Sequence, residues 1–118
     1  MKEKLKEIQE RFNLEVSFKS IEAMLVKTSN PRFKYYEGQI SPYFSLTNMM
    51  AFFDTFHSSY IVHVYLEDST MTITTRNSTY VFEILDAELL EWFEDGVLFE
   101  LGDKEIELIE EWLKGAGL

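Results

Sequence analysis

The sequence has no cysteine and little proline or glycine. The missing cysteines exclude disulfide bonds and thiolate metal sites, and with them the small secreted scaffolds that depend on disulfides. Two prolines and five glycines in 118 residues argue against long irregular linkers. A chain of this length is the size of one ordinary domain, so we expect a single domain over residues 1–118.

Long hydrophobic runs are missing as well. The longest uninterrupted apolar run is MMAFF at residues 49–53, far shorter than the ~20 residues of a membrane-spanning helix. The first residues, MKEKLKEIQERF, are charged and lack the apolar stretch and small-residue cleavage site of a secretory signal. We therefore expect a cytoplasmic protein that makes no membrane contact.

Positive charge is scarce and unevenly distributed. The chain has 11 basic and 21 acidic side chains, for a net charge of −10. Residues 1–34 carry +3, whereas residues 86–118 carry −9. Direct binding of nucleic acid or of an anionic membrane needs a positive surface, so both are disfavoured. A basic partner protein is favoured instead.

Three segments rich in β-branched and aromatic residues give the clearest structural pattern. They are YIVHVYL at 60–66, MTITTR at 71–76 and TYVFEI at 79–84, and short polar breaks separate them. They predict an antiparallel three-stranded meander. Hydrophobic residues make up 46% of the chain, which is enough to build a core around such a sheet.

Helices and further strands are expected on both sides of the meander. Apolar periodicity and capping residues predict helices at residues 2–12, 47–56, 87–93 and 104–114, and strands at 14–18, 21–26, 33–36 and 97–101. A helix at 21–26 and a hairpin in place of the last helix remain open alternatives. The fold class is α+β: one domain with a mainly antiparallel sheet and three to four short helices, with the 47–56 and C-terminal helices on one face.

The acidic residues of the C-terminal region are more numerous than local stability requires. Asp86 and Asp103 suit helix N-termini, where the helix macrodipole favours negative charge. Glu91, Glu94 and Glu111 fall near predicted C-termini, where the same dipole disfavours them. Two explanations are open. In the first, the basic N-terminal segment packs against these acids, either within one chain or across a homodimer. In the second, the acids bind a basic partner.

The second explanation gives the leading hypothesis, a small non-enzymatic binding protein. Carboxylates at i,i+3 and i,i+4 on a helix lie about 5–6 Å apart, which is loosely comparable to the spacing of phosphates on a nucleic-acid strand. Such a surface could occupy the basic groove of a nuclease or other nucleic-acid-binding enzyme and inhibit it. The candidate residues are Glu91, Glu94, Asp95, Glu107, Glu110 and Glu111. In composition the chain resembles small viral inhibitors of host defence, including anti-CRISPR proteins, which are short, acidic, cysteine-free and α+β.

Aromatic residues are concentrated between positions 33 and 56. Most of them are expected in the core, but Tyr35, Tyr36 and Tyr43 lie beside polar residues and form a candidate contact patch. An apolar pocket between helix and sheet, binding a small molecule, is a further alternative. So is a structural or assembly protein that dimerises through its basic and acidic segments.

No residue pattern predicts catalysis or a cofactor. His57 and His63 lack the spacing of paired metal ligands, so no metal is expected. Asp54 and His57, with Ser58 or Ser59, superficially suggest a catalytic triad, but no nucleophile-elbow glycines surround either serine. We therefore expect no enzymatic activity and no cofactor.

Overall fold

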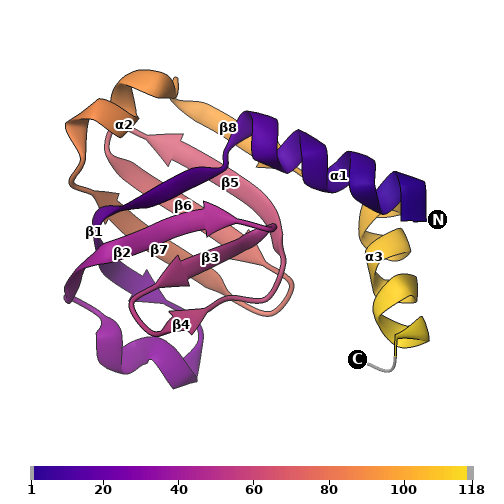
Figure 1. Ribbon diagram of the computed structural model, residues 1–118. Coiled ribbons are helices and arrows are strands. Elements are labelled where there is room, and N and C mark those ends of the chain that lie inside the picture. The colour runs from indigo at the N-terminus through magenta and orange to yellow at the C-terminus, as the bar shows by residue number, and fades with distance from the viewer. Residues whose placement is uncertain (1, 117–118) are drawn as a thin grey trace.

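Eight strands, three α-helices and one 3₁₀ helix make up the computed structural model, which describes residues 2–116. Figure 1 shows their arrangement. In chain order the elements are α1 (Lys2–Glu15), β1 (Phe18–Thr28), the 3₁₀ helix η1 (Pro31–Tyr36), β2 (Ile40–Thr47), β3 (Met50–Phe53), β4 (Phe56–His57), β5 (Ile61–Glu67), β6 (Thr70–Thr75), β7 (Thr79–Ile84), α2 (Ala87–Trp92), β8 (Gly96–Glu100) and α3 (Asp103–Gly115).

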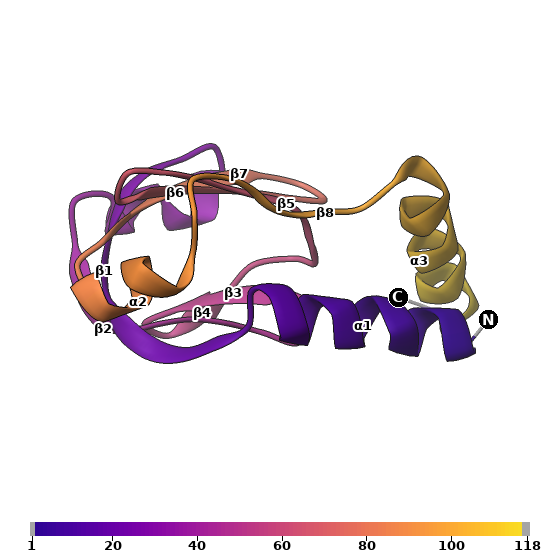
Figure 2. The ribbon, with the colours of Figure 1, turned by 90° about the horizontal axis from the view of Figure 1, so that it is seen from above.

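All eight strands belong to one antiparallel sheet, in the order β4-β3-β2-β1-β7-β6-β5-β8. The long strand β1 pairs with β2 from Phe18 to Met24 and with β7 from Ala23 to Thr28. Its register shifts on both sides, as expected where a sheet bends. The sheet therefore folds over at β1 into two layers, with β2–β4 in one and β5–β8 in the other (Figure 2).

The core lies between these layers and is rich in aromatic rings. Phe82 of β7 stacks on Phe44 of β2 at a centroid distance of 4.2 Å and meets Phe53 of β3 at 5.4 Å. Strand β7 buries every second residue, and so does β6, because alternate side chains of a strand point to opposite faces. The fold class predicted from the sequence, α+β with an antiparallel sheet, is confirmed.

The predicted meander is present as β5, β6 and β7, which pair in sequence order. It forms part of the larger sheet. The predicted elements at 2–12, 87–93, 97–101 and 104–114 correspond to α1, α2, β8 and α3. Asp86 caps α2 by accepting hydrogen bonds from the amides of Glu88 and Leu89. The strand alternative is correct for 21–26, which lies within β1.

The helix predicted over residues 47–56 is wrong, because this segment forms two tight hairpins. Asn48 and Met49 have φ of 52° and 60°, the pair of positive values that closes a two-residue type I′ turn between β2 and β3. Asp54, with φ of 53°, lies in the turn between β3 and β4. The apolar spacing suits a helix, but it equally leaves Ala51 and Phe53 on the buried face of a strand.

Two other predictions, for the segments that precede and follow β1, are wrong. The segment 33–36 is 3₁₀ helix and not strand, since Asn30 caps it and Pro31 occupies its first turn, where proline is well tolerated. Strand 14–18 does not form, because α1 continues to Glu15 and β1 starts at Phe18.

The C-terminal helix α3 was predicted to cover a sheet face but does not, and neither does α1. They extend together beyond one end of the two layers, and α2 lies at the opposite end (Figures 1 and 2). The inner faces of the sheet are covered by one another, so the layers need no helix between them. None of the helices in residues 2–116 is long and apolar enough to cross a membrane.

Candidate functional site

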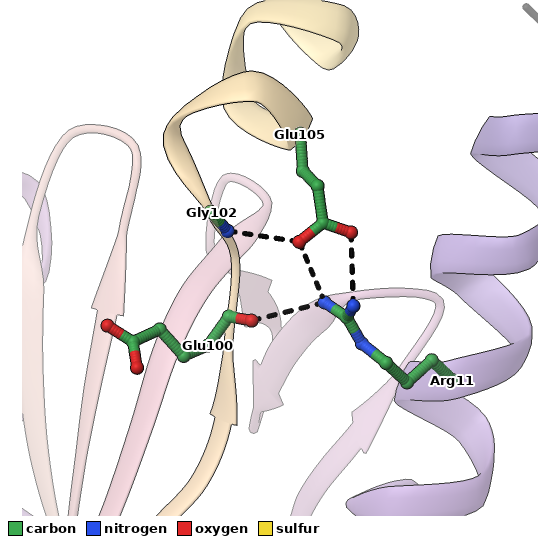
Figure 3. Close-up of polar contacts among 4 residues, drawn as sticks. All are labelled: Arg11, Glu100, Gly102 and Glu105. Atoms are coloured by element: carbon green, nitrogen blue, oxygen red, sulfur yellow. Dashed lines mark hydrogen bonds and ion pairs between the residues drawn. The ribbon is translucent and has the colours of Figure 1, made fainter.

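Helices α1 and α3 are joined by one charged contact. The guanidinium of Arg11 donates to both carboxylate oxygens of Glu105, at 3.0 and 3.2 Å (Figure 3). It also donates to the backbone carbonyl of Glu100 at 3.1 Å and lies over the ring of Phe99. Phe12 packs edge-on against the same ring at 5.1 Å. The predicted pairing of basic N-terminal and acidic C-terminal segments therefore occurs within one chain at this position.

Glu105 also closes the first turn of α3. The amide of Gly102, the residue just before the helix, donates to the Glu105 carboxylate at 3.0 Å, so a side chain of the first turn satisfies a backbone N–H at the helix N-terminus. Partial burial alone would raise the pKa of Glu105, but the Gly102 amide and the Arg11 guanidinium outweigh it, and this pKa is held below its ordinary value. Glu105 is therefore a structural carboxylate.

A second half-buried carboxylate fastens α3 to the sheet. Glu110 accepts a hydrogen bond from the Tyr60 hydroxyl at 2.8 Å and pairs with Arg76 at 2.8 Å. Burial of Tyr60, together with this hydrogen bond to an anion, raises the pKa of the phenol to about 12. Two of the acids of α3 thus have structural partners, and these are the two ion-paired carboxylates within residues 2–116.

An open groove of about 380 Å³ runs between α1, α3 and the β2–β3 turn. Its volume is within the range of pockets for small ligands. Apolar side chains form most of its lining, and Ile8, Met49 and Ile109 at its floor are buried in the core. The other apolar lining residues, together with the ring of Tyr60, are Leu5, Met50, Trp112 and Leu113. Trp112 remains 41% exposed although α3 buries its neighbour Ile109.

Charge at the groove is opposite to that of the whole protein. Lys2 and Lys6 are the charged side chains of its lining, and no carboxylate lines it. They are four residues apart on α1, so they lie on the same side of the helix. Neither forms an ion pair with any residue in the described part of the chain. The groove therefore combines apolar walls with a cationic rim.

The six predicted acidic residues are divided between the two ends of the molecule. Glu91 lies in α2 and Glu94 and Asp95 in the turn that follows, whereas Glu107, Glu110 and Glu111 lie in α3 (Figure 1). The structure therefore does not bring them into one surface. Glu110 is engaged by Tyr60 and Arg76, and Asp95 accepts a hydrogen bond from the amide of Asp68 at 3.1 Å. The other four are exposed.

The three predicted tyrosines differ in exposure. Tyr35 of η1 is 82% exposed and Tyr43 of β2 is also exposed, whereas Tyr36 is half-buried against Phe33 and Phe56. Tyr35 and Tyr36 contact each other edge-on at 5.8 Å. Part of the predicted contact patch is therefore an extension of the core.

Of the residues that superficially suggest catalysis, Ser58 and His57 have hydrogen-bond partners. Ser58 is buried, and its hydroxyl accepts from the amide of Ala51 at 2.9 Å and donates to the carbonyl of Ser59 at 2.7 Å. His57 is exposed beside the Ser58 carbonyl, and His63 lies half-buried on β5. Within residues 2–116, no three histidine or carboxylate side chains gather as a metal site requires.

The groove residues were not among those predicted from the sequence. Two features of the sequence point toward it: Trp112 on the apolar arc of α3, and lysines at i,i+4 beside Leu5 on α1. Neither shows that the two helices are adjacent. Comparisons of the chain with protein-family models, with curated sequences and with solved structures found no match.

Proposed function

We propose that this protein is a non-enzymatic binding protein whose ligand is a small molecule with an apolar body, held in the groove between α1 and α3. The observation that carries the proposal is the groove itself: about 380 Å³, lined mainly by apolar side chains and open to solvent. Apolar surface left in water is unfavourable, so a groove of this kind is stabilised by an apolar occupant.

Several of the lining residues suit an occupant of variable shape. Met49 and Met50 are flexible and polarisable, and Trp112 offers a large flat surface. The volume of about 380 Å³ is within the range of pockets that hold one small ligand. The groove lies between two helices and a turn, and α3 is held to its neighbours at Glu105 and at Glu110.

Fluorescence of Trp112 provides the test. The chain has two tryptophans, and Trp92 is 82% exposed on α2, so Trp92→Phe leaves Trp112 as the only tryptophan reporter without disturbing the core. Titration with the neutral alcohol decanol should shift the Trp112 emission to shorter wavelength and saturate. Leu5→Gln, in the groove, should weaken binding about tenfold or more, since burying an apolar side chain contributes about 1.5–3 kcal/mol.

Leu14→Gln is the matched control on the same helix. Leu14 is 88% exposed and does not line the groove, so this variant should bind decanol as the parent does. Far-UV circular dichroism would establish that both variants keep their helices. If decanol does not change the Trp112 emission, or if the two leucine variants bind decanol equally well, the groove is excluded as the ligand site.

A second candidate function is binding of a basic partner by the acidic surface, as a mimic of nucleic acid that occupies the groove of a nuclease or similar enzyme. It is supported by Glu107 and Glu111, which are exposed, four residues apart on α3 and unpaired within the described residues. At this spacing the two carboxylates lie on one side of the helix.

Labelled polylysine is a defined probe for that candidate. Glu107→Gln with Glu111→Gln should weaken its binding more than Glu91→Gln with Glu94→Gln on the α2 side, although both pairs change the net charge equally. Binding to a specific surface should also weaken with added salt. Equal losses from the two pairs would show only a general response to net charge, and the second candidate would be abandoned.

A further inference from the structure

We infer that the ligand of the groove is an anionic amphiphile, a free alkyl carboxylate whose chain lies against the apolar walls and whose head group meets Lys2 and Lys6. The inference rests on the proposed function, because it requires that the groove holds an apolar chain. It adds the chemical class of that ligand and the residues that would recognise its charge.

The charge of the groove is complementary to an anionic head group. The protein carries −10 overall, yet the groove lining contains two lysines and no carboxylate. Its remaining polar side chains are the neutral Gln9, Asn48 and Tyr60. A cation bound anywhere on this protein is favoured by the net charge, whereas an anion is favoured only where cations are concentrated locally. The rim formed by Lys2 and Lys6 is such a place.

The Tyr60 side and the α1 side of the groove differ in whether they can bind the carboxylate of the ligand. The Tyr60 hydroxyl already donates to Glu110, and that carboxylate pairs with Arg76 behind it. A ligand carboxylate would find no free donor at Tyr60 and would approach the charge of Glu110. At the α1 side Lys2 and Lys6 form no ion pair within residues 2–116. The head group is therefore directed to the lysines and the chain toward Trp112 and Leu113.

The size of the groove also favours this class of ligand. A volume of about 380 Å³ suits a single chain with a small head group. Lysine stems can cover part of such a chain while their ammonium groups stay in water, so Lys2 and Lys6 can contact both parts of the ligand. This favours a free carboxylate over the lipids of a bilayer surface, which would meet the protein over a wider area.

Three ligands with the same ten-carbon chain test the inference: decanoate, decanol and decyltrimethylammonium, each below its micelle concentration. Trp112 emission in the Trp92→Phe background reports binding of each. Decanoate should bind more tightly than the cation, despite the net charge of −10. Lys2→Gln with Lys6→Gln should weaken decanoate about fivefold to tenfold and leave decanol unchanged, in keeping with partly exposed ion pairs.

Lys27→Gln with Lys34→Gln is the matched control. It removes the same charge from exposed positions of β1 and η1, outside the groove lining, and should leave decanoate binding unchanged. Decanol binding combined with a preference for the cation, or with equal effects of the two lysine pairs, would overturn the anionic ligand and keep the proposed function. Failure of all three ligands to bind would overturn both.

Discussion

The two-layer sheet and the α1/α3 pair are stabilised in different ways. Between the layers, stacked aromatic rings such as Phe44 and Phe82 are fully buried, and apolar burial dominates. Beyond the end of the sheet, α3 buries one residue, Ile109, and is fixed by two half-buried carboxylates, Glu105 and Glu110. Here partly buried apolar side chains of α3 (Ile106, Leu108 and Leu113) and two charged contacts together hold the helix, and an apolar groove stays open beside it.

Part of the excess of acidic residues in the C-terminal region has a structural role. Glu105 and Glu110 are positioned by partners from α1, the end of β6 and the start of β5, so they belong to the structure. Glu107 and Glu111 face solvent on the same helix and have no such partner in the described residues. One helix thus carries structural acids on its inner side and free acids on its outer side.

The largest effect is expected in the aromatic core. Phe82→Ala should lower the free energy of unfolding by about 3–5 kcal/mol, because it leaves a cavity between Phe44 and Phe53. Urea unfolding followed by circular dichroism would measure it. Tyr35→Ala, at a side chain that is 82% exposed, is the control and should stay within about 0.5 kcal/mol. Similar losses in both variants would contradict the assignment of the core.

An intermediate effect, confined to the helices, is expected at Glu105. Glu105→Gln should destabilise α3 by about 1 kcal/mol, a value discounted because both Arg11 and Glu105 are partly exposed. Amide exchange in α3 should accelerate about fivefold, while exchange in β6 should not change. Equal acceleration in both elements would mean that the α1/α3 pair and the sheet unfold as one unit.

The same carboxylate predicts a dependence on acid. Its pKa is lowered in the folded state, so its contribution is fully present above the ordinary value of 4.5 and is lost as the pH falls through the folded value. The wild type should therefore lose more stability below pH 4.5 than Glu105→Gln does. Urea midpoints measured across this range would show whether the two proteins converge.

The smallest effect is expected at Tyr60 and appears only in alkali. Because its pKa is raised from 10.0 to about 12, the stability it contributes is present below pH 10 and is lost as the pH rises toward 12. Glu110→Gln should lower this pKa, though burial will keep it above the ordinary value. Tyrosinate absorbance, with Tyr60→Phe to identify the signal, would measure the change. An unaltered titration in Glu110→Gln would contradict the role of this hydrogen bond.

Local sequence patterns were sufficient for much of the sheet but not for the turns. Richness in β-branched and aromatic residues, broken by short polar segments, predicted β5, β6 and β7. The prediction of a helix after Thr47 was wrong because the spacing of apolar residues there is compatible with both a helix and a strand. Asn48 and Asp54, two residue types that readily adopt positive φ, were the local evidence for hairpins there.

The groove could not be predicted, for a different reason. Its walls come from α1 and α3, and the contact that joins them, Arg11 with Glu105, spans 94 positions of the sequence. Periodicity indicates which side of a helix is apolar, but not which other helix it meets. The charge asymmetry of the chain did indicate that the two terminal segments attract one another, without showing where.

The shared strand β1 has a mechanical consequence. It is hydrogen-bonded to β2 on one side and to β7 on the other, so in the order of the described strands the two layers are joined through β1. Detaching β1 would leave one edge of β2 and one edge of β7 without hydrogen-bond partners and would open the aromatic core. Separating the layers therefore requires breaking the pairing of this one eleven-residue strand with β2 or with β7.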